Sequence, residues 1–276
     1  MTAALELDDE LPPLQLSGDP SALSYDHRRG VLYIAEGKSG TILALDGWQR
    51  TRLAMIESGD GIGSSRVGGL ALAPDGTVYA TRPSPGAVFC IRDSVEPIAS
   101  LGPRWIRAGI VYDAASHALF TTQYLDGGIE GLVARIDLET QETTAIACGF
   151  AQPVAIAKLG PTLVVADAKL ATVYRVELVD GHAVYCAPLA EDIDRPTAVC
   201  AAGISSVLVA TYDAQHARGA IRQVWLDGRH RTICSGTWEP SGIAATDDLV
   251  YIALRGERRV IVAARSPVRA SSPSVV

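Results

Sequence analysis

The stretch TVYATR (residues 77–82) follows the turn residues Pro74-Asp75-Gly76, and this arrangement recurs along the chain. A short run of β-branched and aromatic residues after a turn is typical of a β-strand. Six such runs occur: VLYIAE (31–36), TVYATR (77–82), ALFTTQ (118–123), TLVVAD (162–167), VLVATY (207–212) and LVYIAL (249–254). Their third residues are 41 to 46 positions apart. The chain is therefore predicted to repeat one β-unit six times.

A second marker lies about ten residues upstream of each run, as expected for a repeat with a conserved internal layout. It is an apolar residue in every unit: Leu23, Leu70, Ile110, Ile156, Val199 and Ile243. A small residue always precedes it: Ala22, Gly69, Gly109, Ala155, Ala198 and Gly242. Units of 40 to 50 residues with four short strands are typical of β-propeller blades. We therefore predict an all-β, six-bladed β-propeller with four antiparallel strands per blade.

Six units use nearly the whole chain, so a single domain over residues 1–276 is predicted. The expected blades cover residues 18–60, 61–104, 105–150, 151–193, 194–236 and 237–264. Too little strand-like sequence follows Ala264 for a last strand, because the tail 265–276 is rich in Pro and Ser and is expected to be disordered. We therefore expect an N-terminal strand near residues 12–17 to complete the sixth blade and close the ring.

Composition narrows the function classes. The net charge of −7 and the lack of a basic stripe argue against nucleic acid and anionic membranes as partners. No window is apolar enough for a membrane helix, and the acidic start MTAALELDDELPP does not resemble a secretion signal. The five cysteines lack zinc-site spacing. A cytoplasmic protein with reduced thiols is expected, and its oligomeric state stays open.

Three segments carry a resemblance to known propellers: residues 74–80 (PDGTVYA), 163–167 (LVVAD) and 240–244 (PSGIA). They resemble repeats of the NHL, strictosidine-synthase-like and gluconolactonase/regucalcin-like families. The last resemblance implies a divalent metal held in the channel by a Glu, Asn residues and an Asp. This chain contains no asparagine, and the positions where such ligands would fall carry Gly68, Ala108 and Thr197. We therefore predict neither a metal nor another cofactor.

The repeat alignment predicts which residues surround one end of the channel, where each first strand begins and each second strand ends. The start positions are Asp19, Arg66, Ile106 with Arg107, Gln152, Arg195 and Glu239. The end positions are Glu36, Arg82, Gln123, Asp167, Tyr212 and Leu254 with Arg255. Such an opening is a preferred ligand cleft, and arginines suit a carboxylate or phosphate. The alternative is that these are turn residues that bond to one another.

The favoured hypothesis is a metal-independent acid/base enzyme, of lyase, cyclase or hydrolase type, for a small anionic or zwitterionic metabolite. A carboxylate in a partly dry channel can act near neutral pH. Asp167 and Glu239 are the first candidates, Glu36 is the third, and Tyr212 would bond an oxyanion. Glu239 also resembles the catalytic acid of strictosidine-synthase-like propellers in position. The predicted substrate-binding residues are Arg66, Arg82, Arg107, Arg195, Gln123, Gln152, Asp19 and His216.

Two alternatives remain open. One is a divalent-metal-dependent lactonase or hydrolase that uses Glu36, Asp167 and Asp19 as an unusual ligand set. The other is a non-catalytic binding or scaffold propeller, which paired rim residues and a plugged channel would favour. The pattern of the repeat specifies a fold better than it specifies a reaction.

Overall fold

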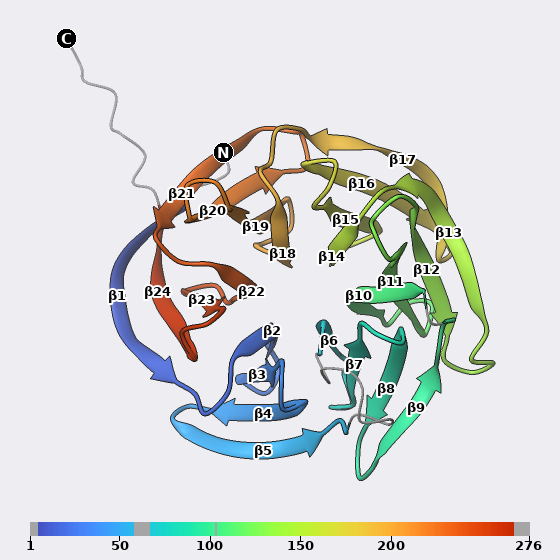
Figure 1. Ribbon diagram of the computed structural model, residues 1–276, viewed down its shortest axis with the longest axis horizontal. Coiled ribbons are helices and arrows are strands. Elements are labelled where there is room, and N and C mark those ends of the chain that lie inside the picture. Colours follow the sequence, from blue (N-terminus) through green and yellow to red (C-terminus); the bar gives the residue numbers. More distant parts are fainter. Residues whose placement is uncertain (1–4, 58–66, 103, 268–276) are drawn as a thin grey trace.

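The computed structural model describes residues 5–57, 67–102 and 104–267. Within these ranges the chain forms 24 strands and no helix, and so contains no helix that could span a membrane. The strands make six four-stranded antiparallel sheets, arranged as blades in a ring around a central opening (Figure 1). The predicted six-bladed β-propeller is confirmed.

Blades 1 to 5 run from the centre outwards in chain order, whereas the outermost strand of blade 6 is the first strand of the chain. Blade 1 holds β2 (Pro20–Asp26), β3 (Val31–Glu36), β4 (Thr41–Asp46) and β5 (Gln49–Met55); blade 2 holds β6 (Gly69–Leu72), β7 (Val78–Arg82), β8 (Ala87–Ile91) and β9 (Val95–Ala99). Blade 3 holds β10 (Trp105–Asp113), β11 (Ala118–Leu125), β12 (Gly131–Asp137) and β13 (Thr143–Phe150); blade 4 holds β14 (Pro153–Leu159), β15 (Thr162–Asp167), β16 (Thr172–Val179) and β17 (His182–Ala190). Blade 5 holds β18 (Pro196–Ala201), β19 (Ser206–Asp213), β20 (Arg218–Trp225) and β21 (His230–Gly236); blade 6 holds β22 (Pro240–Ala245), β23 (Leu249–Leu254), β24 (Arg259–Pro267) and β1 (Leu5–Gln15).

The small residue at the start of the innermost strands has a steric reason. A Cβ on Gly69 would lie 2.9 Å from the carbonyl oxygen of Ala108 in the next blade, and one on Gly109 would lie 2.9 Å from Cα of Ala155. Real Cβ contacts are longer than this, and backbone cannot move aside cheaply. The recurring small residue therefore lets neighbouring inner strands approach each other around the channel.

The apolar marker residues hold neighbouring blades together. Each of the six belongs to a different buried hydrophobic cluster: Leu70, Val199, Ile243, Leu23, Ile156 and Ile110. Burial of apolar surface is the main favourable term in folding. The ring is therefore stabilised by six separate cores between blades.

The ring closes through the first strand of the chain. β1 pairs antiparallel with β24, with Leu5 opposite Pro267 and Gln15 opposite Arg259. Leu14 is buried in the cluster between blades 6 and 1. The closing strand was expected near residues 12–17, but it is longer and ends at Gln15. β24 also continues to Pro267, so residues 265–267 of the expected tail are in a strand, and the rest of the tail lies outside the described residues.

Candidate functional site

The two ends of the ring differ in the kind of loop that they contain. We call the end with the blade-to-blade connections the crossover face, and the opposite end the turn face. At the crossover face the strand pairing sets the start of each first strand beside the end of the second, as in Arg107 opposite Gln123 and Pro153 opposite Asp167. At the turn face each first strand turns directly into the second. Among the described residues, the predicted start and end positions therefore lie at the same end of the ring.

A girdle of six apolar residues divides the central channel. The same marker residues line the cavities on both sides of it: Leu23, Leu70, Ile110, Ile156, Val199 and Ile243. On the crossover side the cavity holds only about 60 Å³ and is lined largely by small residues such as Gly68, Gly109 and Gly242. On the turn side it holds about 270 Å³. The larger chamber of the channel therefore lies at the end opposite to the one where the sequence placed the ligand.

Asp167 is fully buried at the crossover face, and its carboxylate is occupied by backbone amides. Its Oδ2 accepts from the amide of Ala151 (2.7 Å) and its Oδ1 from those of Lys169 and Leu170 (3.0 Å each). The amide of Gln152 lies 3.1 Å from both oxygens. The side chain therefore joins the connection that precedes blade 4 to the turn that follows β15. Asp167, which the sequence favoured as a catalytic acid or base, therefore has a structural role here.

The other three predicted acids also have partners on the crossover face. Glu36 is buried and accepts from the amide of Gly18 (2.7 Å) and the hydroxyl of Ser39 (3.2 Å). Asp19 accepts from the amide of Gly256 at 2.6 Å, a contact between blades 1 and 6, and Glu239 pairs with Arg255 at 2.8 Å within blade 6. These contacts agree with the alternative in which rim residues bond to one another.

The predicted arginines do not converge on a common site. Arg66 lies outside the described residues, Arg195 is exposed, and Arg82 donates to the carbonyl oxygen of Glu57 at 3.0 Å. Arg107 is fully buried, and burial lowers its pKa to about 10. With the amide oxygen of Gln123 turned towards it, Arg107 donates from Nη2 (2.9 Å) and Nε (3.3 Å), while Nη1 has no hydrogen-bond partner. Arg107 is therefore a buried cation without a carboxylate among the described residues.

We expect Arg107→Met to leave the protein as stable or to raise its melting temperature. Removing the guanidinium abolishes the cost of burying an uncompensated charge, while methionine keeps most of the volume. Thermal unfolding at neutral pH measures this, with Arg107→Ala as the control that leaves a cavity. A large loss of stability in Arg107→Met would show that the guanidinium has a strongly stabilising partner.

The remaining predicted residues are dispersed along the crossover face. Tyr212 is half-buried, and its amide donates to the carbonyl oxygen of Arg195 (3.2 Å). Gln152 hydrogen-bonds the hydroxyl of Tyr124, whose pKa is raised by burial. His216 is 73% exposed, and its Nδ1 lies 2.5 Å from Oδ2 of Asp213. These three side chains lie in blades 4 and 5 and do not form one pocket with the predicted acids.

The turn-side chamber carries a different set of polar groups: Ser24, Tyr25, His27, Tyr112, Lys158 and Cys200. Lys158 lies near the end of β14, and its Nζ is 3.0 Å from Oδ1 of Asp113 and 2.5 Å from the carbonyl oxygen of Gly160. An ammonium group has three donors. Two are used by these contacts, and the third has no partner among the described residues.

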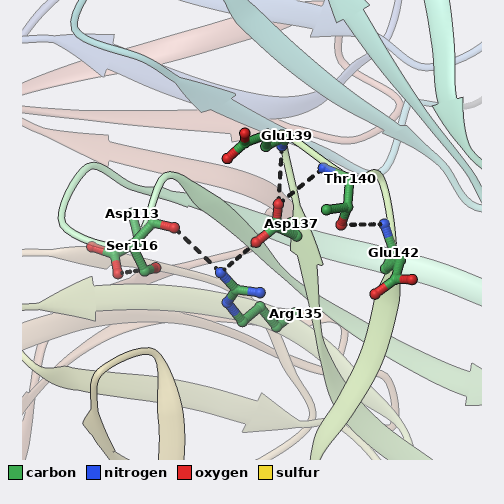
Figure 2. A network of polar contacts seen from close by, with 7 residues as sticks. All are labelled: Asp113, Ser116, Arg135, Asp137, Glu139, Thr140 and Glu142. Carbon is green, nitrogen blue, oxygen red and sulfur yellow. Dashed lines mark hydrogen bonds and ion pairs between the residues drawn. The ribbon is translucent and has the colours of Figure 1, made fainter.

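A polar network behind Lys158 holds Asp113 in place (Figure 2). The hydroxyl of Ser116 donates to Oδ2 of Asp113 at 2.7 Å, and the carbonyl oxygen of Ser116 accepts from Arg135 at 3.3 Å. Arg135 also pairs with Asp137 at 2.8 Å. Burial opposes ionisation of Asp113, but hydrogen bonds from Ser116 and Lys158 outweigh it and lower its pKa. At neutral pH Asp113 is therefore a fixed anion that orients the Lys158 ammonium.

Aromatic rings form the walls on both sides of the chamber. Tyr25 stacks on Tyr251 with ring centroids 5.9 Å apart, and Tyr112 stacks on Tyr79 at 6.1 Å. The hydroxyl of Tyr112 lies 3.2 Å from Nδ1 of His117, a pair that can pass a proton. The chamber therefore combines a cation and aromatic surface, and Tyr112 in its wall lies within hydrogen-bond distance of the His117 imidazole.

The sequence contained a weak signal for this chamber that the repeat alignment did not use. Lys158 is one of three lysines in the chain and lies two residues after the marker Ile156, on the strand that lines the channel. His27, an exposed turn residue, also lines the chamber, beside Tyr25 at 5.1 Å between ring centroids. Only the closed ring shows that these turns surround one cavity.

The described residues do not fit the metal site that a resemblance to gluconolactonases implies. No group of three or more His, Cys, Asp or Glu side chains in these ranges could hold a metal ion. Glu36 and Asp167 bond to amides of their own blades, and amide donors compete for the lone pairs a cation would need. The proposed set of Glu36, Asp167 and Asp19 therefore does not form a shared site.

The fold and the channel define a class: a six-bladed β-propeller with a polar chamber at one end of its central channel. No family model and no curated protein sequence matches the chain. Among solved structures it is similar to a gluconolactonase from Xanthomonas campestris (10% identity, TM-score 0.73, 96% of this chain and 99% of the other).

It is also similar to a calcium-binding protein, regucalcin, from Agrobacterium tumefaciens (14% identity, TM-score 0.70, 98% of each chain). The virginiamycin B lyase of Staphylococcus aureus matches with 16% identity and a TM-score of 0.63, over 92% of this chain and 98% of the other. The resemblance to gluconolactonase- and regucalcin-like propellers is thus confirmed for the fold. At these sequence identities the comparisons do not indicate a reaction or a ligand for this chain.

Proposed function

We propose that this protein binds a small anionic or zwitterionic metabolite in the turn-side chamber of its central channel. The observation that carries the proposal is the chamber of about 270 Å³ with Lys158 in its wall, held by Asp113 and with one donor unused. A carboxylate of the ligand would accept from this donor, and Tyr25 and Tyr112 would contact its apolar part. The girdle closes the inner end, so the ligand enters from the turn face.

Metal-independent acid/base chemistry on such a ligand would use the Tyr112–His117 pair. A histidine side chain can act as a general acid or base, and its contact with the phenol provides a path for a proton. Asp167, Glu239, Glu36 and Tyr212 lie on the crossover face, beyond the girdle from this chamber. The proposal therefore assigns the chemistry to the turn face, with the reaction being lysis, cyclisation or hydrolysis.

We expect Lys158→Met to weaken ligand binding at least about tenfold, because a charge-assisted hydrogen bond is lost. A panel of small carboxylates, sugar lactones and their hydrolysed acids would be screened by thermal shift, and hits would be titrated by calorimetry. Lys169→Met is the matched control, since Lys169 is exposed on the crossover face and donates to the carbonyl oxygen of Gly127. Loss of binding in Lys169→Met with retention in Lys158→Met would place the ligand at the crossover face instead.

A divalent-metal-dependent lactonase is the second candidate, since gluconolactonase and regucalcin share this fold. Metal analysis of protein purified without chelator separates the candidates. A stoichiometric divalent ion, together with lactone hydrolysis that is lost on chelation and restored by the ion, would favour the lactonase. Hydrolysis that survives chelation would favour the metal-independent chamber.

A further inference from the structure

A second pocket, of about 280 Å³, lies on blade 5 at the crossover face and is separate from the channel. Ala220 lies at the centre of this pocket, and the strand pairing places it opposite Thr211 on β19 and Ser235 on β21. Arg218 and Arg222 are two residues to either side on β20, so their side chains project from the same face of the sheet. The pocket thus has a floor of one methyl group between two hydroxyls, with an arginine at each end.

Neither arginine is fully used by the protein. Arg218 is exposed, and its guanidinium has no hydrogen bond or ion pair within the described ranges. Arg222 makes only long contacts, at 3.5 Å to Asp194 and 3.4 Å to the carbonyl oxygen of Asp192. Its Nε is buried without a partner. A buried donor without an acceptor is costly, so the pocket wall is short of acceptor atoms.

Two acidic residues, Asp194 and Asp213, also line the pocket, but they do not supply an acceptor to Arg218 or to Nε of Arg222. Asp213 lies opposite Arg218 in the strand pairing, but its carboxylate bonds His216 and the amides of Gln215 and His216. The hydrogen bond from the His216 side chain is the main reason that the pKa of Asp213 is lowered. Asp194 is 66% exposed and meets Arg222 only at the long distance given above. The carboxylate of Asp213 is therefore hydrogen-bonded within its own turn.

We propose that this blade 5 pocket binds an oxyanion, the carboxylate or phosphate group of a small metabolite. Two arginines offer planar pairs of donors that match such a group, and the hydroxyls of Thr211, Thr232 and Ser235 can add further hydrogen bonds. The oxyanion provides the acceptors that Arg218 and Nε of Arg222 lack. This site is independent of the chamber beside Lys158.

The test uses inorganic phosphate and acetate as probes, titrated separately by calorimetry into the full-length protein at low ionic strength, where surface charges are least screened. Wild-type protein is expected to bind at least one probe saturably, and the stronger probe identifies the preferred group. Arg218→Ala should weaken this binding about tenfold, the size of one charge-assisted interaction. Arg218→Lys should restore it only in part, because lysine keeps the charge without the planar fork.

Arg52→Ala is the matched control, because Arg52 is also an exposed strand arginine, on β5 of blade 1. It should leave the affinity of the pocket for the probe unchanged. Arg218 is exposed, so its replacement should not alter the melting temperature. Absence of saturable binding of both probes, or equal effects of Arg218→Ala and Arg52→Ala, would overturn the proposal.

Discussion

Removal of residues 1–17 is expected to leave the chain unable to fold into a soluble protein. The deletion removes β1, the outer strand of blade 6, and with it the pairing to β24 that joins the two ends of the chain. It also removes Leu14 from the core between blades 6 and 1. β24 would become an open edge next to a damaged core, and such edges favour aggregation.

Soluble yield after lysis and the cooperativity of thermal unfolding measure this effect. The matched control is deletion of residues 268–276, which begins after the last residue of β24 and should leave both properties unchanged. A truncated protein that lacks residues 1–17 but unfolds cooperatively at the wild-type temperature would show that the ring does not need its N-terminal strand.

Asp167→Ala is expected to lower the free energy of unfolding by at least about 3 kcal/mol, because buried amides lose a charged acceptor. The amides are those of residues 151, 152, 169 and 170, and a methyl group replaces no part of their hydrogen bonding. Asp167→Asn should cost less, since its amide oxygen can still accept from some of them.

Urea unfolding at neutral pH checks this, with Asp46→Ala as the control because Asp46 is exposed at the end of β4. Activity or ligand binding should be measured on Asp167→Asn at a temperature where it remains folded. Wild-type stability combined with complete loss of turnover would instead support the catalytic role that the sequence suggested for Asp167.

The fold was predictable because its signal is local and repeated. Each blade carries a turn, a β-branched run and a small residue before an apolar one, and the six copies reinforce one another. Closure by the N-terminus followed from a count of the strands left for the sixth blade. The exact extent of that strand was less predictable, because β1 contains two irregularities in register, one of them around Pro12 and Pro13.

The candidate site was predictable only in part. The repeat alignment named Arg107 as a start position and Gln123 and Asp167 as end positions; in the structure Arg107 lies opposite Gln123, and Asp167 bonds the connection before blade 4. It could not show that the carboxylates of Asp167 and Glu36 would be occupied by backbone amides. The sequence does not distinguish a side chain that points into a channel from one that hydrogen-bonds to its own turn.

The sequence alone determined the number of blades, the four strands in each and the positions of the small and apolar marker residues, because these depend on spacing and on alternation along one chain. Only the tertiary structure decided which end of the channel holds the larger chamber. It also brought Lys158 to Asp113, and Arg218 and Arg222 to either side of one pocket. These arrangements depend on how the blades pack and on which polar atoms remain unpaired once the ring is closed. Neither the packing nor the unpaired atoms can be read from the amino-acid sequence.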